Sequence, residues 1–132
     1  WVGQMARTHM FTTATPALLA STVLTSLHLL DEAQAARTHL RALIAQLQAG
    51  VTGLPWSLLP STTPIQPLII GDAAEAVAVS EALWAQGVWV NAIRPPTVPA
   101  LTARLRIALS SAHRHEEVAC LLAALHTVAA MR

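Results

Sequence analysis

The segment IQPLIIGDAAEAVAVSEALWAQGVWVNAI, residues 65–93, decides the fold. Its apolar run over 65–70 ends at a glycine, which predicts a strand. Asp72 then predicts a helix N-cap, and Glu75 three residues later completes the pattern of a capping box. Apolar residues recur at helical spacing up to the next glycine, and the run over 88–93 predicts a second strand. The segment therefore predicts a strand, a helix and a strand in succession.

The sequence that follows predicts a loop, a third strand and a closing helix. Residues 94–99, RPPTVP, predict an extended loop because proline disfavours helix before and within it. Residues 104–109 alternate between two sides, with arginines on one and Leu and Ile on the other, as in a half-buried strand. Apolar residues at helical spacing predict a last helix over 116–130.

The sequence that precedes it predicts two helices between irregular segments. Residues 1–14 are expected to be irregular or extended. Apolar faces predict helices over 16–30 and 32–49, with Gly50 where a C-terminal cap would stand. Residues 51–64 are rich in Pro, Gly, Ser and Thr and predict a loop.

This order of elements predicts an α+β fold, with a sheet of about three antiparallel or mixed strands covered by helices. We expect two parts. Residues 1–50 would form an interdomain segment with long helices, and residues 51–132 a small α/β domain.

Composition excludes several classes of function. Hydrophobic residues make up 54% of the 132 residues and charged ones 11%, against about 25% in an average soluble domain, which argues against disorder. A net charge of +1 without a basic patch argues against nucleic-acid binding. The longest uncharged stretch, 42–71, is broken by prolines and glycines, so we expect no membrane span. All eight basic residues are arginine, and the chain contains no lysine.

Two groups of polar residues near the predicted strands are candidates for binding. Arg104 and Arg106 fall on the same side of their strand, and a pair of guanidiniums suits a carboxylate or a phosphate. The commoner alternative is the solvated face of an edge strand. Arg94 and Thr97 stand in a loop stiffened by three prolines, which indicates either a ligand site or a rigid connector.

Two further groups have commoner structural explanations. Thr12 and Thr13 precede a helix start, where hydroxyls and free N–H groups suit a phosphate but also serve as ordinary N-caps. His113 and His115 stand beside two glutamates, but the sequence offers no third and fourth ligand at good spacing. We therefore expect no metal site.

Five segments together resemble the C-terminal part of the 8-amino-7-oxononanoate synthases, pyridoxal-phosphate enzymes of the α-oxoamine synthase group. They are 6–13, 65–72, 87–99, 102–107 and 110–113. The RPPTVP loop is the most specific of them, and the resemblance covers essentially the whole chain. It implies the small C-terminal domain of the pyridoxal-phosphate aminotransferase-like fold. Because the chain begins with Trp rather than Met, we expect a fragment from which the large cofactor domain is absent.

The resemblance also implies an activity. The family condenses L-alanine with pimeloyl-CoA, or with pimeloyl-carrier protein, and releases carbon dioxide at an early step of biotin biosynthesis. Pyridoxal 5′-phosphate would be the cofactor, and the complete enzyme would be a cytoplasmic homodimer.

Five residues carry roles by this resemblance. Thr97 would contact the substrate at the mouth of the active site, and Arg106 would hold the carboxylate of the amino acid as a bidentate partner. Arg94 would lie near the acyl substrate. Thr12 and Thr13 would reach the cofactor phosphate, in this family across a dimer interface.

The chain lacks one part of the family pattern and departs from the pattern at two positions. The lysine that binds the cofactor would lie upstream of residue 1, so we expect the chain alone to be inactive. Leu101 stands where the family usually has Gly, and a positive φ there would be strained. Arg114 stands where a Thr usually caps the last helix, a loss of about 1 kcal/mol.

Two alternatives remain beside the synthase hypothesis. One is a sister α-oxoamine synthase that uses another amino acid or thioester, such as a glycine C-acetyltransferase-like enzyme. The RPPT sequence favours the first hypothesis over this one. The other is a non-catalytic interaction or dimerisation domain. It is disfavoured because the helix over 16–30 carries no charge on any face, so we expect this helix to be buried against further protein.

Overall fold

A computed structural model describes residues 1–131. These residues form two compact units, one over 1–35 and one from Ala36 onward, and each unit is taken by itself. Among the described helices, none combines the length and the apolar character needed to cross a membrane. The predicted division after residue 50 stays a prediction. The helix that ends at residue 50 lies mostly in the second unit, and its buried residues belong to the core of that unit.

The first unit consists of two single-turn helices and one long helix. They are α1 (Val2–Met5), α2 (Arg7–Met10) and α3 (Ala17–Glu32). The expectation of an irregular segment over 1–14 is wrong for α1 and α2, because a single helical turn is too short to show a periodic pattern. The prediction of a helix over 16–30 is confirmed by α3, which begins directly after Pro16.

Helix α3 buries none of its residues within the described chain. Its large apolar side chains are exposed on every side of the helix, from Leu18 at 80% to Val23 at 51%. The hydroxyls of Thr22 and Ser26 donate to carbonyls one turn earlier, so these two side chains are satisfied within the helix.

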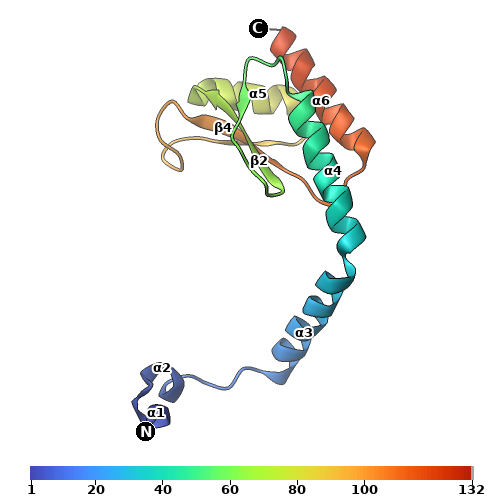
Figure 1. The fold of residues 1–132 in the computed structure, drawn as a ribbon. Helices are drawn as coiled ribbons and strands as arrows, with labels where there is room; N and C mark the ends of the chain where they lie inside the picture. Colours follow the sequence, from blue (N-terminus) through green and yellow to red (C-terminus); the bar gives the residue numbers. More distant parts are fainter. Residues whose placement is uncertain (132) are drawn as a thin grey trace. The chain divides into compact units, whose positions relative to one another are not determined.

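The second unit is built on a four-stranded antiparallel sheet with the order β1-β2-β4-β3. Its strands are β1 (Ser57–Leu58), β2 (Ile65–Gly71), β3 (Asn91–Ile93) and β4 (Ala103–Ala108). The sequence predicted about three strands and missed β1, a two-residue strand inside a segment predicted as loop. Strand β3 is shorter than the predicted 88–93, and Trp89 is 76% exposed in the approach to it. Figure 1 shows the sheet with its helices.

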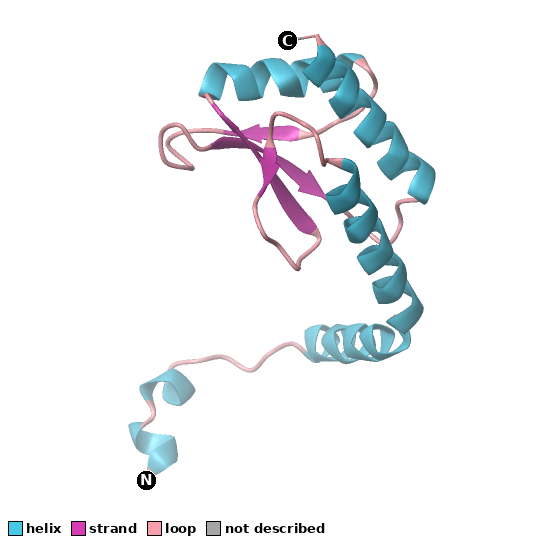
Figure 2. Ribbon diagram, turned by 45° about the horizontal axis from the view of Figure 1, so that its top comes forward, coloured by secondary structure: helices cyan, strands magenta, loops and turns pink. Residues whose placement is uncertain are grey.

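Three helices pack against this sheet: α4 (Gln34–Gly50), α5 (Ala73–Ala85) and α6 (His115–Ala130). Each confirms a predicted helix. The predicted cap at the start of α5 is also confirmed, because Oδ1 of Asp72 accepts a 2.9 Å hydrogen bond from the backbone N–H of Glu75. The indole Nε1 of buried Trp56 donates to Oε1 of Glu75 at 3.2 Å, which ties the approach to β1 to the first turn of α5. In Figure 2, α5 lies along one side of the strands.

The core of the second unit lies between the sheet and these helices. Strand β4 turns Ala103, Leu105 and Ile107 inward, as its alternation predicted. The fully buried leucines that complete this core are Leu43, Leu47, Leu68, Leu83 and Leu125. The buried polar residue Gln66 is satisfied on all sides, since it donates to the carbonyls of Ser61 and Thr63 and accepts from the side chain of Gln48.

The opposite side of the sheet carries no helix of this unit, and we call it the open face. In the antiparallel ladders, Arg106 stands between Pro67 and Asn91, and Arg104 stands between Ile69 and Ile93. Directly opposed residues point to the same side of a sheet. The open face therefore consists of Ile65, Pro67, Ile69, Asn91, Ile93, Arg104, Arg106 and Ala108. It contains two guanidiniums and no carboxylate.

Helices α4 and α6 run side by side, which both ribbon views show. The ring Nε2 of His39 donates to the carbonyl of His113 at 2.8 Å, and Nε2 of His126 donates to the carbonyl of Gly50 at 2.9 Å. Gly50 is the last residue of α4 and has no positive φ, so the helix includes the residue that was predicted to cap it. Glycine stands there because α6 approaches closely.

Candidate functional site

The loop 94–102 joins β3 to β4 at one end of the open face. The backbone N–H of Thr97 donates to the carbonyl of Arg94 at 3.1 Å, and that of Thr102 donates to the carbonyl of Pro99 at 3.2 Å. The peptide bond between Pro95 and Pro96 is cis. The loop is thus built from closed turns, and these turns present the side chains of Arg94 and Thr97 to solvent.

The base of this loop contains a residue in the left-handed region. Leu101 has a φ of 61°, which a side chain with a Cβ adopts only at a cost. The strain that the sequence predicted for this position is therefore present. The Leu101 carbonyl oxygen lies 3.9 Å from the position that a Cβ on Gly71 would take, and Gly71 itself has a φ of 102°.

Arg106 lies in β4, two residues beyond Arg104, and its side chain is exposed. Within the part of the chain that the structure describes, its guanidinium makes no hydrogen bond and no ion pair. An unpaired guanidinium presents two parallel N–H groups that match the two oxygens of a carboxylate. Arg106 is therefore available to an anionic ligand.

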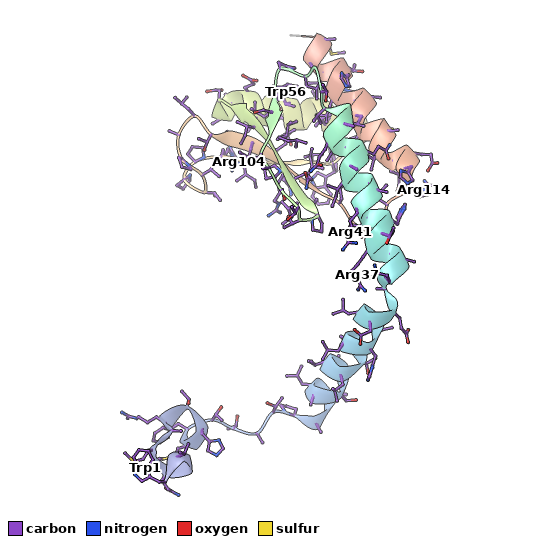
Figure 3. The ribbon with its side chains drawn as sticks, viewed as in Figure 1. Trp1, Arg37, Arg41, Trp56, Arg104 and Arg114 are labelled. Atoms are coloured by element: carbon purple, nitrogen blue, oxygen red, sulfur yellow. The ribbon has the colours of Figure 1, made fainter. Side chains whose placement is uncertain are left out.

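Arg104 occupies the same face but is held by its own loop. Its Nε donates to the carbonyl of Thr102 at 3.0 Å, and its Nη2 donates to the hydroxyl of Thr102 at 3.2 Å. The Thr102 hydroxyl in turn donates to the carbonyl of Pro99 at 2.8 Å. Figure 3 labels Arg104 on the sheet. The two arginines that the sequence grouped as one pair therefore differ in what they bind.

A cleft of about 350 Å³ opens between β4 and the first half of α6. Arg106 lines it together with polar groups of the segment that enters α6, among them His113 and Glu117. Its apolar wall is formed by Val88, Trp89, Val90, Ile107, Leu109, Val118 and Leu121. This cleft could not be predicted from the sequence, because three segments distant in sequence form it. An exposed Trp89 was the one signal, and it was assigned to the middle of a strand.

Arg114 and Glu117 shape the start of α6 at the edge of this cleft. The backbone N–H of Arg114 donates to Oε2 of Glu117 at 2.7 Å, and the guanidinium lies 3.5 Å from Oε1. The backbone hydrogen bond, and then the charge of Arg114, hold the pKa of Glu117 below its ordinary value despite the opposing effect of desolvation. An arginine side chain has no acceptor for the helix N–H groups. Glu117 therefore satisfies the backbone N–H of Arg114, which is one half of a capping box, and does not replace the acceptor that a Thr at 114 would have offered to the helix N–H groups.

Thr12 and Thr13 lie in the first unit, in the connection between α2 and α3. Both are exposed, and among residues 1–131 neither hydroxyl has a hydrogen-bond partner. They belong to a different compact unit from Arg106. Hydroxyls of this kind suit a phosphate, whereas the lysine needed to bind pyridoxal phosphate covalently is not among the 132 residues.

Comparison with known families decides the class of the chain. The sequence profile of the class I and II aminotransferases matches residues 1–125. The chain belongs to the class I and II aminotransferase family. The aminotransferase-like fold predicted for it is confirmed by solved structures. The serine palmitoyltransferase of Sphingomonas wittichii has a TM-score of 0.80 at 29% identity, over 98% of this chain and 33% of that enzyme.

Other members of the aminotransferase family refine the comparison. The 8-amino-7-oxononanoate synthase of Aromatoleum aromaticum is 53% identical over 132 residues, which is all of this chain and 34% of that protein. The synthase of Dechloromonas aromatica is 52% identical over 126 residues, with 96% and 33% covered. The solved synthase of Francisella tularensis has a TM-score of 0.74 at 23% identity, over 96% of this chain and 37% of that one, and shows the fold alone.

Two facts follow for this aminotransferase-family chain. It spans about a third of the length of the curated relatives that it matches. A serine palmitoyltransferase from S. paucimobilis, with a TM-score of 0.78 at 26% identity over 95% of this chain and 32% of that one, was solved with an aldimine of pyridoxal phosphate and myriocin bound. The dependence on pyridoxal phosphate that the resemblance implied is therefore confirmed at the level of the family.

Proposed function

We propose that this chain forms the C-terminal third of a pyridoxal-phosphate-dependent C-acyltransferase of biotin biosynthesis. The enzyme would condense L-alanine with pimeloyl-CoA, or with pimeloyl-carrier protein, and release carbon dioxide. The observation that carries the proposal is the 53% identity to an 8-amino-7-oxononanoate synthase along all 132 residues. The geometry of the open face agrees with it, because the substrate amino acid carries a carboxylate.

Arg106 is the residue we assign to the carboxylate of alanine. Its guanidinium is exposed, lacks a partner among the described residues and lies on a face without carboxylates. A bidentate contact would fix both the position and the rotation of the amino acid. When bound, pyridoxal phosphate supplies the electron sink that stabilises the carbanion of the amino acid. The part of Arg106 is to hold the amino acid in place while that chemistry occurs.

The loop 94–102 is assigned to the mouth of the site. Thr97 would contact the substrate there, and Arg94 would lie near the acyl thioester. Support comes from their exposure and from the turn that joins them, in which the Thr97 N–H donates to the Arg94 carbonyl. A loop fixed by such turns loses little conformational freedom when a ligand binds.

The remaining roles belong to the complete enzyme. Thr12 and Thr13 would donate to the cofactor phosphate across a dimer interface, and their exposed hydroxyls agree with that role. The lysine would come from outside these 132 residues, so the chain alone would be inactive. We also assign the enzyme to the cytoplasm as a homodimer.

One observation favours a sister activity as the second candidate. The solved serine palmitoyltransferase overlays 98% of the chain with a TM-score of 0.80, so the same fold serves an enzyme that is named for serine and a palmitoyl group. Its identity of 29% is well below the 53% to the curated synthase. The synthase assignment is therefore preferred.

A chimera tests the assignment directly. The third of the Aromatoleum aromaticum synthase that this chain matches would be replaced by residues 1–132, and the parent enzyme would be the control. We expect the chimera to bind pyridoxal phosphate, seen by its absorbance, and to turn over L-alanine with pimeloyl-CoA.

Amino-acid preference separates the two candidates. Preference for serine or glycine over alanine would favour the sister activity. A chimera that is folded and loaded with cofactor but fails to turn over any of the three amino acids would contradict both candidates.

A further inference from the structure

Arg104 and Arg106 are two residues apart on one face of β4, yet only Arg104 has its donors engaged. From this difference we infer that Arg104 is a positioning residue, which holds the loop 94–102 in the conformation that presents Thr97 and Arg94. The substrate-facing part of this inference rests on the proposed function. The part that concerns the loop rests on the hydrogen bonds alone.

Arg104 ties together the two ends of the loop. Its backbone pairs in register with Ile93, the last residue before the loop begins. Its side chain donates to Thr102, the last residue of the loop before β4 begins. The Thr102 hydroxyl in turn donates to the carbonyl of Pro99, which lies inside the loop. One residue therefore fixes the entry, the exit and an interior point of the loop.

The chemistry of this contact requires an arginine. Thr102 offers two acceptors, its carbonyl and its hydroxyl, and these face Nε and Nη2 of the guanidinium. The planar fork meets both acceptors at once, whereas the single nitrogen of lysine has no such fixed pair of donors. Arg104 is half-buried, so water competes less for these bonds than at exposed Arg106.

The loop also needs such a restraint. Leu101, directly before Thr102, has a φ of 61°. An unfavourable backbone conformation persists only when its surroundings hold it. The bonds from Arg104 to Thr102, and from Thr102 to Pro99, are the restraints on either side of that residue. Without them, relaxation at Leu101 would move the segment that carries Thr97.

The test uses the chimera, with variants chosen to separate positioning from ligand binding. Arg104→Gln removes the guanidinium and with it both bonds to Thr102. Thr102→Val removes the bond to the hydroxyl and the bond from the hydroxyl to Pro99, and leaves the carbonyl acceptor in place. Arg106→Gln makes the same chemical change on the same face of the same strand, without a bond to the loop. Arg104→Lys keeps the charge but not the fork, and Thr102→Ser keeps the hydroxyl. Hydrogen exchange of the amides over 94–102 and kcat/KM with alanine and pimeloyl-CoA are measured for each.

We expect Arg104→Gln and Thr102→Val to raise amide exchange in the loop about tenfold and to lower kcat/KM by a similar factor. The double variant should lose less than the sum of the two single variants, because both remove the bond between Arg104 and the Thr102 hydroxyl. Arg104→Lys should not rescue, and Thr102→Ser should. Arg106→Gln should leave exchange in the loop unchanged. If Arg104→Gln does not fold, Thr102→Val tests the restraint through the two bonds of the Thr102 hydroxyl.

Two results would overturn the inference. One is unchanged loop exchange in the Arg104 and Thr102 variants, and the other is full kcat/KM in Arg104→Lys. A chimera that shows the predicted loop response but no alanine turnover supports the role of Arg104 in the loop and counts against the proposed function alone. A chimera that turns over alanine equally well in the Arg104 variants supports the proposed function and counts against the role of Arg104.

Discussion

Gly50 in α4 packs so closely against Leu122 in α6 that a β-carbon on Gly50 would overlap the methyl groups of Leu122. The hydrogen bond from Nε2 of His126 to the carbonyl of Gly50, at 2.9 Å, joins the two helices at the same point. This contact sets the spacing of the helix pair at the C-terminal end of α4.

Gly50→Ala should therefore destabilise the second unit. Overpacking costs about 1–3 kcal/mol, and the better helix propensity of alanine returns about 0.5–1 kcal/mol, so we expect a net loss of about 1 kcal/mol. Urea unfolding of the chain measures it. Leu122→Ala would make room for the new methyl group, so the double variant should lose less than the sum of the singles. Strict additivity would contradict the overlap.

Leu101→Gly should stabilise the chain by about 0.5–1 kcal/mol. Relief of the left-handed conformation contributes about 1–2 kcal/mol, and the greater freedom of glycine in the unfolded chain offsets part of it. Little packing is lost, because the Leu101 side chain is 80% exposed. Thermal unfolding measures the change, and Leu101→Ala is the control, since alanine keeps the Cβ and the strain. Equal stability of the two variants would show that φ is not the cause.

The start of α6 should contribute stability that depends on pH. The pKa of Glu117 is lowered in the folded chain, first by the backbone hydrogen bond from Arg114. Its contribution is therefore fully present above the unfolded pKa of about 4.3 and is lost as the pH falls through the lower native pKa. Wild type should exceed Glu117→Gln in stability at pH 7, and the two should converge in acid. A stability difference between the two that stays the same in acid would contradict this contribution.

Arg106→Gln should lower the activity of the chimera by weakening its binding of alanine. Removing one partner of a close charge pair costs about 2–5 kcal/mol, so we expect kcat/KM for alanine to fall by at least about 30-fold. The loss should appear as a raised KM for alanine, with the KM for the thioester little changed. Arg106→Lys should recover only part, because it keeps the charge without the fork. Steady-state kinetics with each substrate varied in turn decide this.

The parts of the fold that local sequence determines could be predicted. The cap at Asp72 depends on residues three positions apart, and the alternation of β4 depends on a period of two. The strand β1 could not be predicted, since its two residues form a strand only through pairing with distant Leu68 and Ile69. Trp89 was placed inside a strand because its neighbours are apolar, whereas the pairing of this segment with β4 begins only at Asn91.

The candidate site was predictable as a set of residues but not as an arrangement. Alternation placed Arg104 and Arg106 on one side and could not distinguish them. The distinction arises from the turn at Pro99, which brings Thr102 to Arg104. The cleft beside Arg106 likewise depends on how the start of α6 packs against the sheet, which no spacing in the sequence specifies.

The one-sided covering of the sheet has a consequence for how such a chain can change over time. Along β4, Leu105 and Ile107 serve the core, while Arg104 and Arg106 serve the open face. Mutations that alter recognition and mutations that alter foldability thus fall on alternate residues of a single strand. Selection can therefore change the residues of the open face while the core residues stay the same. The fold can then come to bind new substrates without an intervening sequence that fails to fold.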